Sequence, residues 1–439
     1  MKIAYLCADF GIPVQGHKGA SVHVREMVAA LKAHGHDVRV FVPTLGEGNA
    51  VTAPVHHIGP HGLPETCARL VRSVPRRHPR LDKEVRELAY NGTFYRRLLA
   101  QCRLWRPDAV YERYSLYSLA GLALARRLRV PHLLEVNAPL RLERARTKGL
   151  ALDPLAQLVE RRLFGASDAV LTVSTALQRY VLAHGARRAR TLVLPNAVDT
   201  VRFQPHADGA EARARLGLAP DNVVVGFAGS LKPWHGTDTL LDAFATVHQA
   251  VPAARLLIVG EGPQGDLLRE RATHLGLDTK VVFTGKVAHD AMPGILAAMD
   301  VGVAPYREVD AFYFSPLKLY EYMAAGLAVV ASDAGEIATL VRDGQTGLLC
   351  PPGNATELAA ILLRLVREPS LRARLGAAAR VEAERHTWQE NARTVAALAA
   401  GPAPVAPAGP PPCGVPAGPQ GPAERPVASI TMAAERGRP

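Results

Sequence analysis

The sequence predicts an α/β fold with two Rossmann-like domains, each built on a parallel sheet, that face each other across a cleft. Short apolar segments alternate with amphipathic helices, as in parallel sheets that carry helices on both faces. The alternation occurs twice, on either side of a polar, irregular stretch near residues 201–213. A chain of 439 residues also exceeds one ordinary hydrophobic core. We therefore expect one domain over residues 1–200 and another over residues 201–387.

Each predicted strand is a short apolar segment next to polar or turn-forming residues. In the first half these segments are Ile3–Cys7, Val38–Val42, Ala109–Glu112, His132–Val136, Ala169–Val173 and Thr191–Leu194. In the second half they are Val223–Ala228, Arg255–Val259, Val281–Thr284, Val301–Ala304, Ala328–Ala331 and Gly347–Leu349. Helices are expected between them. In the stretch Ser21–His34, one face is apolar and Gly35 ends the helix.

Composition favours a globular protein of a reducing compartment. The chain is 48% hydrophobic and 21% charged, and no apolar run reaches the ~18 residues of a membrane span. The first segment reaches Asp9 too early for a signal peptide. The cysteines form no C-x-x-C pair, which argues against a disulfide framework or a zinc site: Cys7, Cys67, Cys102, Cys350 and Cys413. We expect a cytoplasmic protein with no metal.

The net charge of +12 comes mostly from arginine, which is dense between Arg69 and Arg162. A basic face could serve an anionic membrane surface, an anionic acceptor or nucleic acid. A solvated surface explains the charge about as well. No nucleic-acid-binding signature accompanies it, so no nucleic-acid partner is expected. From residue 401 onward proline, alanine and glycine dominate, and this tail is expected to be disordered.

The segment Ser315–Gly326 is typical of a short helix whose start binds an anion. Ser315 is a favourable N-cap, and Pro316 suits the first helical position. Free amides and the helix dipole favour a phosphate, and Lys318 adds a positive charge. Glu321 lies on roughly the same face, where its carboxylate could accept ribose hydroxyls. The pattern predicts a site for a sugar-linked diphosphate; a well-capped helix alone explains the caps but not the two charges together.

Further loops follow other predicted strands. The first, residues 11–21, is glycine-rich, although its spacing is not G-x-G-x-x-G. The second, residues 228–238, carries Lys232 and His235, which could both meet a diphosphate, although a histidine alone is more often an ordinary surface residue. Two more, residues 259–263 and 283–289, contain a tight turn and backbone groups that could read the edge of a base. An ordinary strand-to-helix turn explains each of these loops taken alone.

The ordered set of motifs resembles family 4 glycosyltransferases of the GT-B fold. The motifs are the glycine-rich loop after the first strand, G-S-L-K-P-W-H-G, G-E-G-P, T-G-x-V and S-P-L-K-L-Y-E-Y-M-A-A-G. Residues 168–174 and 194–203 also fit, so the resemblance covers residues 1 to about 400. It implies retaining transfer of a sugar from a nucleotide-diphosphate sugar to an acceptor hydroxyl. It also implies a helix over residues 388–400 that returns to the first domain, before the tail of residues 401–439.

The resemblance places the donor mainly in the second domain and the acceptor in the first. The expected catalytic residues are Lys232, Lys318 and Glu321. The expected donor-binding residues are Gly16, Gly19, Ser230, His235, Glu261, Lys286, Val287, Tyr313, Phe314, Ser315, Pro316 and Leu317. Acceptor-side candidates are Arg113, Glu135 and Asn137, at strand ends. The expected co-substrate is a UDP- or GDP-type sugar, without a further cofactor. The acceptor is either soluble or lipid-linked, the latter with peripheral contact to the cytoplasmic face of a membrane.

Three positions depart from the family pattern. Tyr313 stands eight positions before Glu321, where the family has a glutamate that contacts the donor sugar. Ser230 replaces an arginine and His235 replaces a lysine, and Lys232 and Lys318 are candidates to supply the lost charge. These losses give some weight to a non-catalytic nucleotide-sugar-binding protein. A nucleotide-sugar epimerase on the same fold is a second alternative.

The predicted chemistry centres on the departing nucleoside diphosphate, whose growing charge needs preorganised donors and cations. The sequence has no D-x-D to hold a divalent ion, so a helix dipole and a lysine are expected in its place. We expect the acceptor hydroxyl to attack on the face from which the diphosphate leaves, with no covalent enzyme intermediate.

Overall fold

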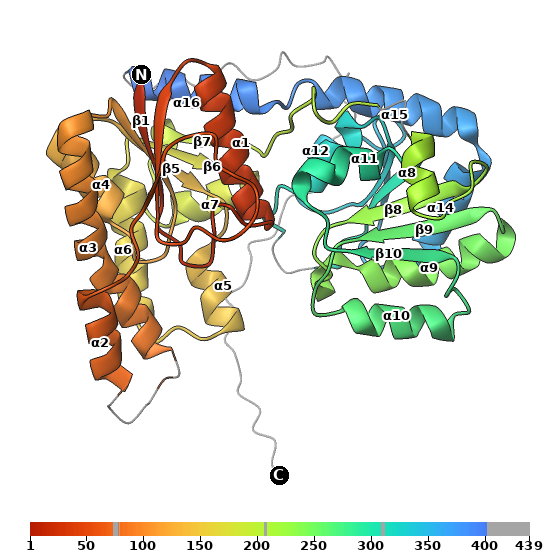
Figure 1. Ribbon diagram of the computed structural model, residues 1–439, viewed down its shortest axis with the longest axis horizontal. Coiled ribbons are helices and arrows are strands. Elements are labelled where there is room, and N and C mark those ends of the chain that lie inside the picture. Colours follow the sequence, from red (N-terminus) through yellow and green to blue (C-terminus); the bar gives the residue numbers. More distant parts are fainter. Residues whose placement is uncertain (73–77, 79, 206–208, 309–311, 402–439) are drawn as a thin grey trace, which may run out of the picture. The chain divides into compact units, whose positions relative to one another are not determined.

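The computed structural model describes residues 1–72, 78, 80–205, 209–308 and 312–401, and it contains two parallel sheets (Figure 1). The first sheet has seven strands in the order β3-β2-β1-β4-β5-β6-β7. The second has six strands in the order β10-β9-β8-β11-β12-β13. Neighbouring strands in both sheets are parallel. The predicted fold class, two Rossmann-like parallel-sheet domains, is confirmed.

The first domain contains these strands: β1 (Lys2–Cys7), β2 (Asp37–Val42), β3 (Val55–His57), β4 (Ala109–Arg113), β5 (His132–Val136), β6 (Ala169–Thr172) and β7 (Thr191–Val193). Its helices are α1 (Gly19–Ala33), α2 (Leu63–Arg72), α3 (Leu81–Trp105), α4 (Ala120–Leu128), α5 (Leu140–Thr147), α6 (Asp153–Ala166) and α7 (Thr175–Ala183).

The second domain contains these strands: β8 (Val223–Ala228), β9 (Ala254–Val259), β10 (Val281–Gly285), β11 (Val301–Ala304), β12 (Ala328–Ser332) and β13 (Leu348–Cys350). Its helices are α8 (Gly209–Arg215), α9 (Thr237–Ala250), α10 (Gly265–His274), α11 (Met292–Leu296), α12 (Leu317–Ala324), α13 (Ile337–Leu340), α14 (Ala355–Arg367) and α15 (Pro369–Ala383). The helix α16 (Trp388–Ala400) follows. Short 3-10 turns lie at Arg188–Arg190, Pro233–His235 and His289–Ala291.

The predicted strands agree with the observed ones to within one residue at each end, and β3 is the strand that the sequence did not predict. Its three residues are partly exposed and include two histidines, so they carry no apolar signal. The helix α1 begins at Gly19, two residues before the expected start at Ser21. The boundaries proposed at residues 200 and 387 stay a prediction; the first sheet ends at Val193 and the second begins at Val223.

Successive residues of the central strands are buried on opposite faces. In β1, Ile3 and Tyr5 belong to the apolar cluster under α1, whereas Ala4 and Leu6 belong to the cluster under α3 and α4. The strand is therefore buried on both faces, which is why its sequence is a continuous apolar run rather than an alternation. The residues of β8 are likewise buried in two apolar clusters, one on each face of the sheet. The loop after β8 therefore begins from a well-packed strand end.

The helix α16 lies at the end of the described chain yet packs in the core of the first domain, beside α1 and above β1 (Figure 1). Trp388 is 2% exposed, and its ring meets the His23 ring edge-on at 4.9 Å. The Asn391 amide donates to the Pro195 carbonyl oxygen at 2.8 Å. This helix thus ties the far end of the chain to the segment that connects the two sheets.

Some expectations fall outside the described residues. These are the disordered tail, apart from Gly401, and with it Cys413 and the arginine pair at residues 76–77. Among the residues that the structure does describe, no helix is long and apolar enough to cross a membrane.

Replacing Trp388 by Ala should destabilise the protein by about 3–5 kcal/mol, because the change leaves a cavity in a closed core. Trp234 is 37% exposed and serves as the matched control, for which Trp234→Ala should cost less than about 1 kcal/mol. Urea unfolding of both variants measures the difference. Equal losses would show that α16 does not belong to the cooperative core.

Candidate functional site

The candidate site lies where the strand order of the second sheet reverses, between β8 and β11. From β8 the chain proceeds to β9 on one side, and from β11 it proceeds to β12 on the other. The loops that leave the carboxyl ends of these two strands therefore diverge, and ligands of such folds bind between them. The loop after β8 holds residues 229–236, and the segment after β11 leads to α12. Both were predicted as ligand-binding loops.

Two glycines allow these loops to pack closely. Gly236 has φ +65°, and a Cβ there would collide with the carbonyl oxygen of Pro305, beyond β11. Gly260 has φ +125°, and its Cβ would collide with the carbonyl oxygen of Gly229. Any other residue would be strained in its backbone and would push the loops apart. The loop after β8 is thus held against both its neighbours.

The Lys318 side chain projects from the first turn of α12 toward the loop after β8. A Cβ on Gly229 would lie 2.7 Å from Lys318 Nζ, so the absent side chain makes room for the amine. Nζ lies 3.9 Å from the centroid of the Phe227 ring and 5.4 Å from that of Tyr306. Within the described residues, the buried amine has no hydrogen-bond partner. Burial lowers the pKa of Lys318 to about 7, against the opposing effect of Glu321.

His235, an expected donor-binding residue, has surroundings that favour its neutral form. Burial, assisted by Lys318, lowers the pKa of His235 to about 3. Its Nδ1 donates to the carbonyl oxygen of Ser230, which leaves a lone pair on Nε2. A lone pair does not favour a phosphate oxygen, so this form of His235 supplies no positive charge here. Its role in donor binding stays a prediction. The ring instead packs edge-on against Tyr306, with centroids 5.3 Å apart.

Lys232 and Ser230 lie at the exposed rim of the same loop. Lys232 Nζ lies 4.8 Å from the centroid of the Trp234 ring. Burial and the nearby Lys18 lower the pKa of Lys232, while Glu143 of α5 opposes them. Lys232 is therefore an outer cation that faces the first domain, and Lys318 is the inner one.

Ser315 does not cap α12 as predicted. The helix begins at Leu317 with Pro316 in the N-cap position and no side-chain cap. The Ser315 hydroxyl instead accepts from the backbone N–H of Asn196 at 3.0 Å, and the Asn196 amide donates to the Ser315 carbonyl oxygen. Because proline at the N-cap has no hydroxyl to offer, the first amides of α12 receive no side-chain acceptor from it.

Glu321 is partly buried and bound to a residue that the sequence did not single out. His289 Nε2 lies 2.8 Å from Glu321 Oε1. His289 Nδ1 lies 3.9 Å from Glu26 of α1, so the histidine sits between two carboxylates. The other oxygen of Glu321 keeps its acceptor capacity.

Tyr313, which stands where a sugar-binding glutamate was expected, points to a carboxylate from the first domain. Its hydroxyl donates to Oε1 of Glu143, on α5. Burial raises the pKa of Glu143, and the charge of Lys232 opposes that effect. Phe314 packs against Tyr313 with the rings tilted by 40° and their centroids 4.4 Å apart. A carboxylate is thus present near this position although the sequence position itself carries a phenol.

The remaining predicted donor residues surround this centre. Gly19 begins α1, and a Cβ there would lie 3.7 Å from the Leu317 side chain. The Gly16 carbonyl oxygen accepts a hydrogen bond from the Arg25 side chain at 2.6 Å. This bond holds the glycine-rich loop after β1 against α1. Pro316 is buried, Val287 is half-buried, and Glu261 and Lys286 are exposed on the loops that follow β9 and β10.

The acceptor-side candidates form a buried polar cluster rather than an open site. Glu135 of β5 is 3% exposed and pairs with His23 Nε2 of α1. Arg113 Nη1 lies 3.5 Å from the second oxygen of Glu135. Burial alone would raise the pKa of the Glu135 carboxyl. His23, and to a lesser extent Arg113, hold this pKa below its usual range. Asn137 follows β5, and its Oδ1 is buried without a partner in the described chain.

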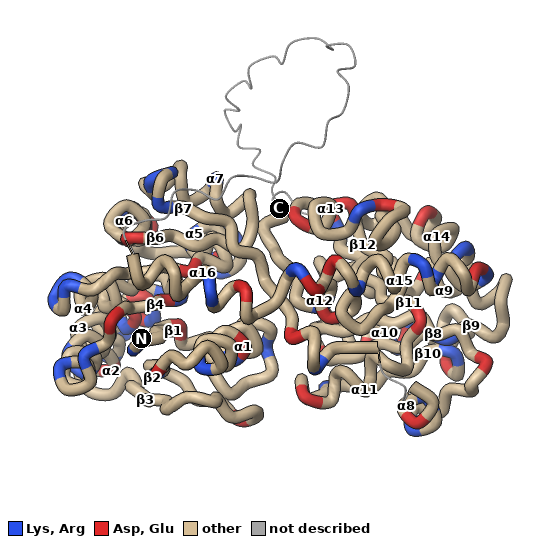
Figure 2. Tube along the Cα trace, turned by 90° about the horizontal axis from the view of Figure 1, so that it is seen from above, with Lys and Arg blue, Asp and Glu red and all other residues tan. Residues whose placement is uncertain are grey.

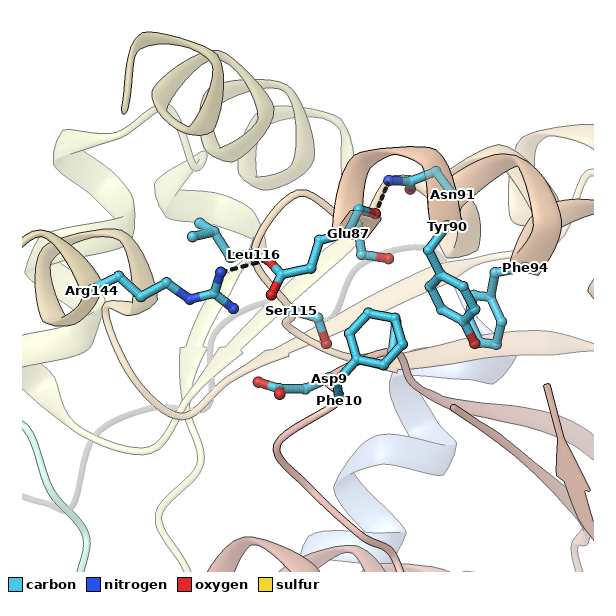
Figure 3. A pocket seen from close by; sticks show the side chains of 11 residues that line it. Asp9, Phe10, Glu87, Tyr90, Asn91, Phe94, Ser115, Leu116 and Arg144 are labelled. Carbon is cyan, nitrogen blue, oxygen red and sulfur yellow. Dashed lines mark hydrogen bonds and ion pairs between the residues drawn. The ribbon is translucent and has the colours of Figure 1, made fainter. Parts of the chain in front are cut away.

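An open cavity in the first domain lies beside this cluster, where β1 and β4 mark the reversal of strand order. Figure 3 shows Asp9 and Phe10 after β1 facing Glu87 and Tyr90 of α3, with Arg144 of α5 reaching in from the side. The space that a water-sized molecule can reach in it is small, about 10 Å³, and it opens to solvent. Arg144 forms an ion pair with Glu87 at its wall. The residues of this cavity were not predicted.

The described residues contain no cluster of three or more histidine, cysteine, aspartate or glutamate side chains that could hold a metal ion. The residues that the sequence missed, His289, Glu143 and His23, come from loops and helices far away in the chain. Their only sequence signal is a position near the end of a predicted strand or at the start of a helix.

Two family profiles match this chain. Residues 18–197 match a "Glycosyl transferase 4-like domain" and residues 222–368 match "Glycosyl transferases group 1". The first match lies in the first parallel-sheet domain, and the second lies in the second domain and includes the loop after β8 and the helix α12. The chain belongs to the family 4-like glycosyltransferases of the GT-B fold.

Curated relatives include proteins named D-inositol 3-phosphate glycosyltransferase. That of Streptomyces bingchenggensis is 32% identical over 303 residues, 66% of this chain and 65% of the relative. That of Stackebrandtia nassauensis is 33% identical over 304 residues, 65% of this chain and 66% of the relative. The match thus spans a little under two thirds of the length of these two relatives. The Nocardia farcinica protein is 29% identical over 401 residues, 85% of this chain and 82% of the relative.

Solved structures show the same fold. HepE of Anabaena superposes with a TM-score of 0.69 at 22% identity, covering 90% of this chain and 98% of that one. Sucrose-phosphate synthase of Thermosynechococcus elongatus superposes with a TM-score of 0.68 at 23% identity, covering 91% and 98%. At these identities the likeness concerns the fold.

Replacing Lys318 by Met should stabilise the folded chain at pH 6 by about 1–4 kcal/mol. Burial lowers the pKa of Lys318 from 10.5 to about 7, so the unfolded chain binds more protons between these values. The penalty is therefore largest below pH 7 and shrinks as the pH rises toward 10.5. Urea unfolding between pH 6 and pH 10 measures it. The exposed Lys286→Met is the control, and the same pH dependence in both variants would contradict the burial of a charge.

Proposed function

We propose that this chain transfers a sugar from a nucleotide-diphosphate sugar to an acceptor hydroxyl, with retention of the anomeric configuration. The observation that carries the proposal is the Lys318 amine, which is buried and without a hydrogen-bond partner at the carboxyl edge of β8 and β11. A buried amine costs folding energy unless an anion completes its environment. A diphosphate at this edge would supply that anion.

Several features support a nucleotide sugar as the donor. Family membership favours it, and the Anabaena HepE structures hold UDP, UDP with glucose, or UDP-glucose. A uridine nucleotide is therefore the first candidate, and a guanosine nucleotide is the alternative. The unpaired amides at the start of α12 add partial positive charge beside Lys318.

The proposed reaction needs no covalent intermediate on the enzyme. The bond from the anomeric carbon to the diphosphate oxygen breaks, and its electron pair leaves with the diphosphate. The acceptor oxygen forms the new bond on the same face of the sugar, and its proton passes to the departing phosphate. Lys318 and the helix amides would stabilise the charge that grows on the leaving group, so we propose that the reaction proceeds without a divalent ion.

Glu321 is proposed to bind the ribose. Its Oε1 is held by His289 at 2.8 Å, so its orientation is fixed before the nucleotide arrives. Its second oxygen remains available to accept a ribose hydroxyl. His289 would then position the carboxylate without touching the donor itself.

The acceptor is proposed to bind in the first domain, in the cavity between Asp9, Glu87 and Arg144. Carboxylates and an arginine suit a hydroxylated compound, and the arginine also suits a phosphate. Because several relatives are named for D-inositol 3-phosphate, inositol phosphates belong in the first acceptor panel. Lipid-linked acceptors presented on vesicles form the second panel.

Replacing Lys318 or Glu321 by Ala should reduce sugar transfer by at least about a hundredfold, because each change removes a group aimed at the leaving diphosphate or its ribose. Turnover is measured as nucleoside diphosphate released from UDP- and GDP-sugars with the acceptor panels. Lys83→Ala and Glu270→Ala, both at exposed positions, are matched controls that should keep full activity.

Wild-type turnover in both site variants would overturn the proposed role of this edge. Nucleotide binding by the unmodified chain without turnover on any acceptor would favour a binding protein instead. Loss of activity in a chelator would overturn the metal-independent step, and an inverted anomeric signal in the product NMR spectrum would overturn retention.

Tyr313 and Glu143 are proposed to contact the transferred sugar together. Tyr313→Phe removes the hydroxyl that holds Glu143, and Glu143→Gln removes the carboxylate. Both variants should raise the KM for the nucleotide sugar by roughly tenfold, because one hydrogen bond to a charged group is lost. The affinity for the free nucleoside diphosphate should stay unchanged, as titration calorimetry would show. An equal loss for both ligands would place this pair outside the sugar site.

A further inference from the structure

The helices α3 and α4 end side by side at the amino edge of the first sheet, the edge opposite to the proposed acceptor cavity. Arg106 follows α3 and leads into β4, and Leu128 ends α4 shortly before β5. An open depression with a volume of about 330 Å³ lies between these two helix ends. It is lined by Leu99, Arg103, Arg106, Pro107, Arg127 and Leu128. Figure 2 shows blue Lys and Arg positions along this part of α3 and α4.

The three arginines of this depression carry charge that the described residues do not neutralise. Arg103, Arg106 and Arg127 are exposed, and their guanidinium groups form no hydrogen bond or ion pair with any described residue. The neighbouring Arg126 differs, because it donates to the carbonyl oxygen of Ala166.

The carboxylates near this part of the chain are already engaged. Asp108 and Glu112 are the only acidic residues between positions 88 and 134. Asp108 accepts from the backbone N–H of Lys2 at 2.7 Å, and the fully buried Glu112 pairs with His132 at 2.9 Å. Asp37 accepts from the indole N–H of Trp105 at 2.7 Å. Among the described residues, none of these three carboxylates forms an ion pair with Arg103, Arg106 or Arg127.

Arginine rather than glycine occupies the left-handed position after each of these two helices. Arg106 has φ +53°, in the left-handed region where glycine is the usual residue after a helix. A non-glycine residue is strained there, and Arg129 after α4 repeats the feature with φ +58°. One basic residue per helix end is explained by the helix dipole. The helix dipole does not explain why three arginines surround one depression that is also lined by apolar residues.

We propose that this depression binds a phosphate group carried by an organic molecule. Guanidinium groups match phosphate oxygens in geometry and charge, and three of them around one space suit a dianion. The apolar floor of Leu99, Pro107 and Leu128 suits the group that carries the phosphate. Leu104, 89% exposed, lies between Arg103 and Arg106 and offers a further apolar contact. The source is a soluble phosphate compound or the phosphate of a lipid headgroup.

The site does not depend on the proposed function. It lies at the amino ends of β4 and β5, whereas the acceptor cavity lies at the carboxyl ends of β1 and β4. A second anion site at the opposite edge of the sheet would either attach the first domain to a membrane surface or bind a soluble phosphate compound. Variants of these arginines should leave sugar transfer in solution unchanged.

Hydrogen–deuterium exchange of the full chain tests the proposal locally. The probes are inorganic pyrophosphate, vesicles of phosphatidylcholine, and vesicles of phosphatidylcholine with phosphatidylglycerol. We expect slower exchange in peptides covering residues 99–107 and 126–130. The double variant Arg103→Ala/Arg127→Ala should abolish this protection and weaken binding at least about tenfold. The matched control, Arg161→Ala/Arg162→Ala, removes the same charge from exposed positions of α6 and should bind normally.

Each outcome decides the question. Protection by pyrophosphate alone supports a soluble phosphate ligand, and protection by the anionic vesicles alone supports a lipid headgroup. Protection by both supports the shared phosphate chemistry. Absent protection with every probe, or equal loss in both double variants, overturns the site. Thermal unfolding of both variants confirms that a loss of binding does not reflect a loss of folding.

Discussion

The reversal of strand order at β1–β4 and again at β8–β11 is the constraint on which the rest of the structure depends. A parallel sheet that grows outward in both directions from its first strand must send two neighbouring loops apart. In the second domain, Gly229 of one loop and the helix α12 that follows the other loop both lie against the Lys318 amine. In the first domain the same divergence opens the cavity between Asp9 and Ser115. The topology therefore favours ligand binding at the carboxyl edges of the two sheets.

The buried lysine at this edge links stability to ligand binding. Lys318 has aromatic rings and a glycine around its amine and no hydrogen-bond partner among the described residues, so the folded chain holds a buried amine that an anionic ligand would satisfy. His289 similarly orients Glu321, and Asn196 holds Ser315 from the segment between the two sheets. The charged groups are fixed beforehand by the fold, which is what stabilisation of a departing anion requires.

Much of this arrangement could be predicted from the sequence, and the failures share a cause. The strands follow from local apolar runs, and the loops at residues 229–236 and 315–318 follow from glycine, proline and lysine at particular places. The neutral form of His235 could not be predicted, because the sequence does not show that its ring is buried next to a lysine. Ser315 was predicted to cap α12, but Asn196, distant in sequence, takes its hydroxyl.

The sequence by itself determined the two α/β domains, the order of the ligand-binding loops and the residue types at the candidate site, because these depend on periodicity and on the identity of neighbours in the chain. Only the tertiary structure decided which groups meet. It paired Tyr313 with Glu143 and Glu321 with His289, and it placed three arginines around one depression at the ends of α3 and α4. Charge and protonation depend on burial and on partners distant in the chain, and those are set by packing rather than by local sequence.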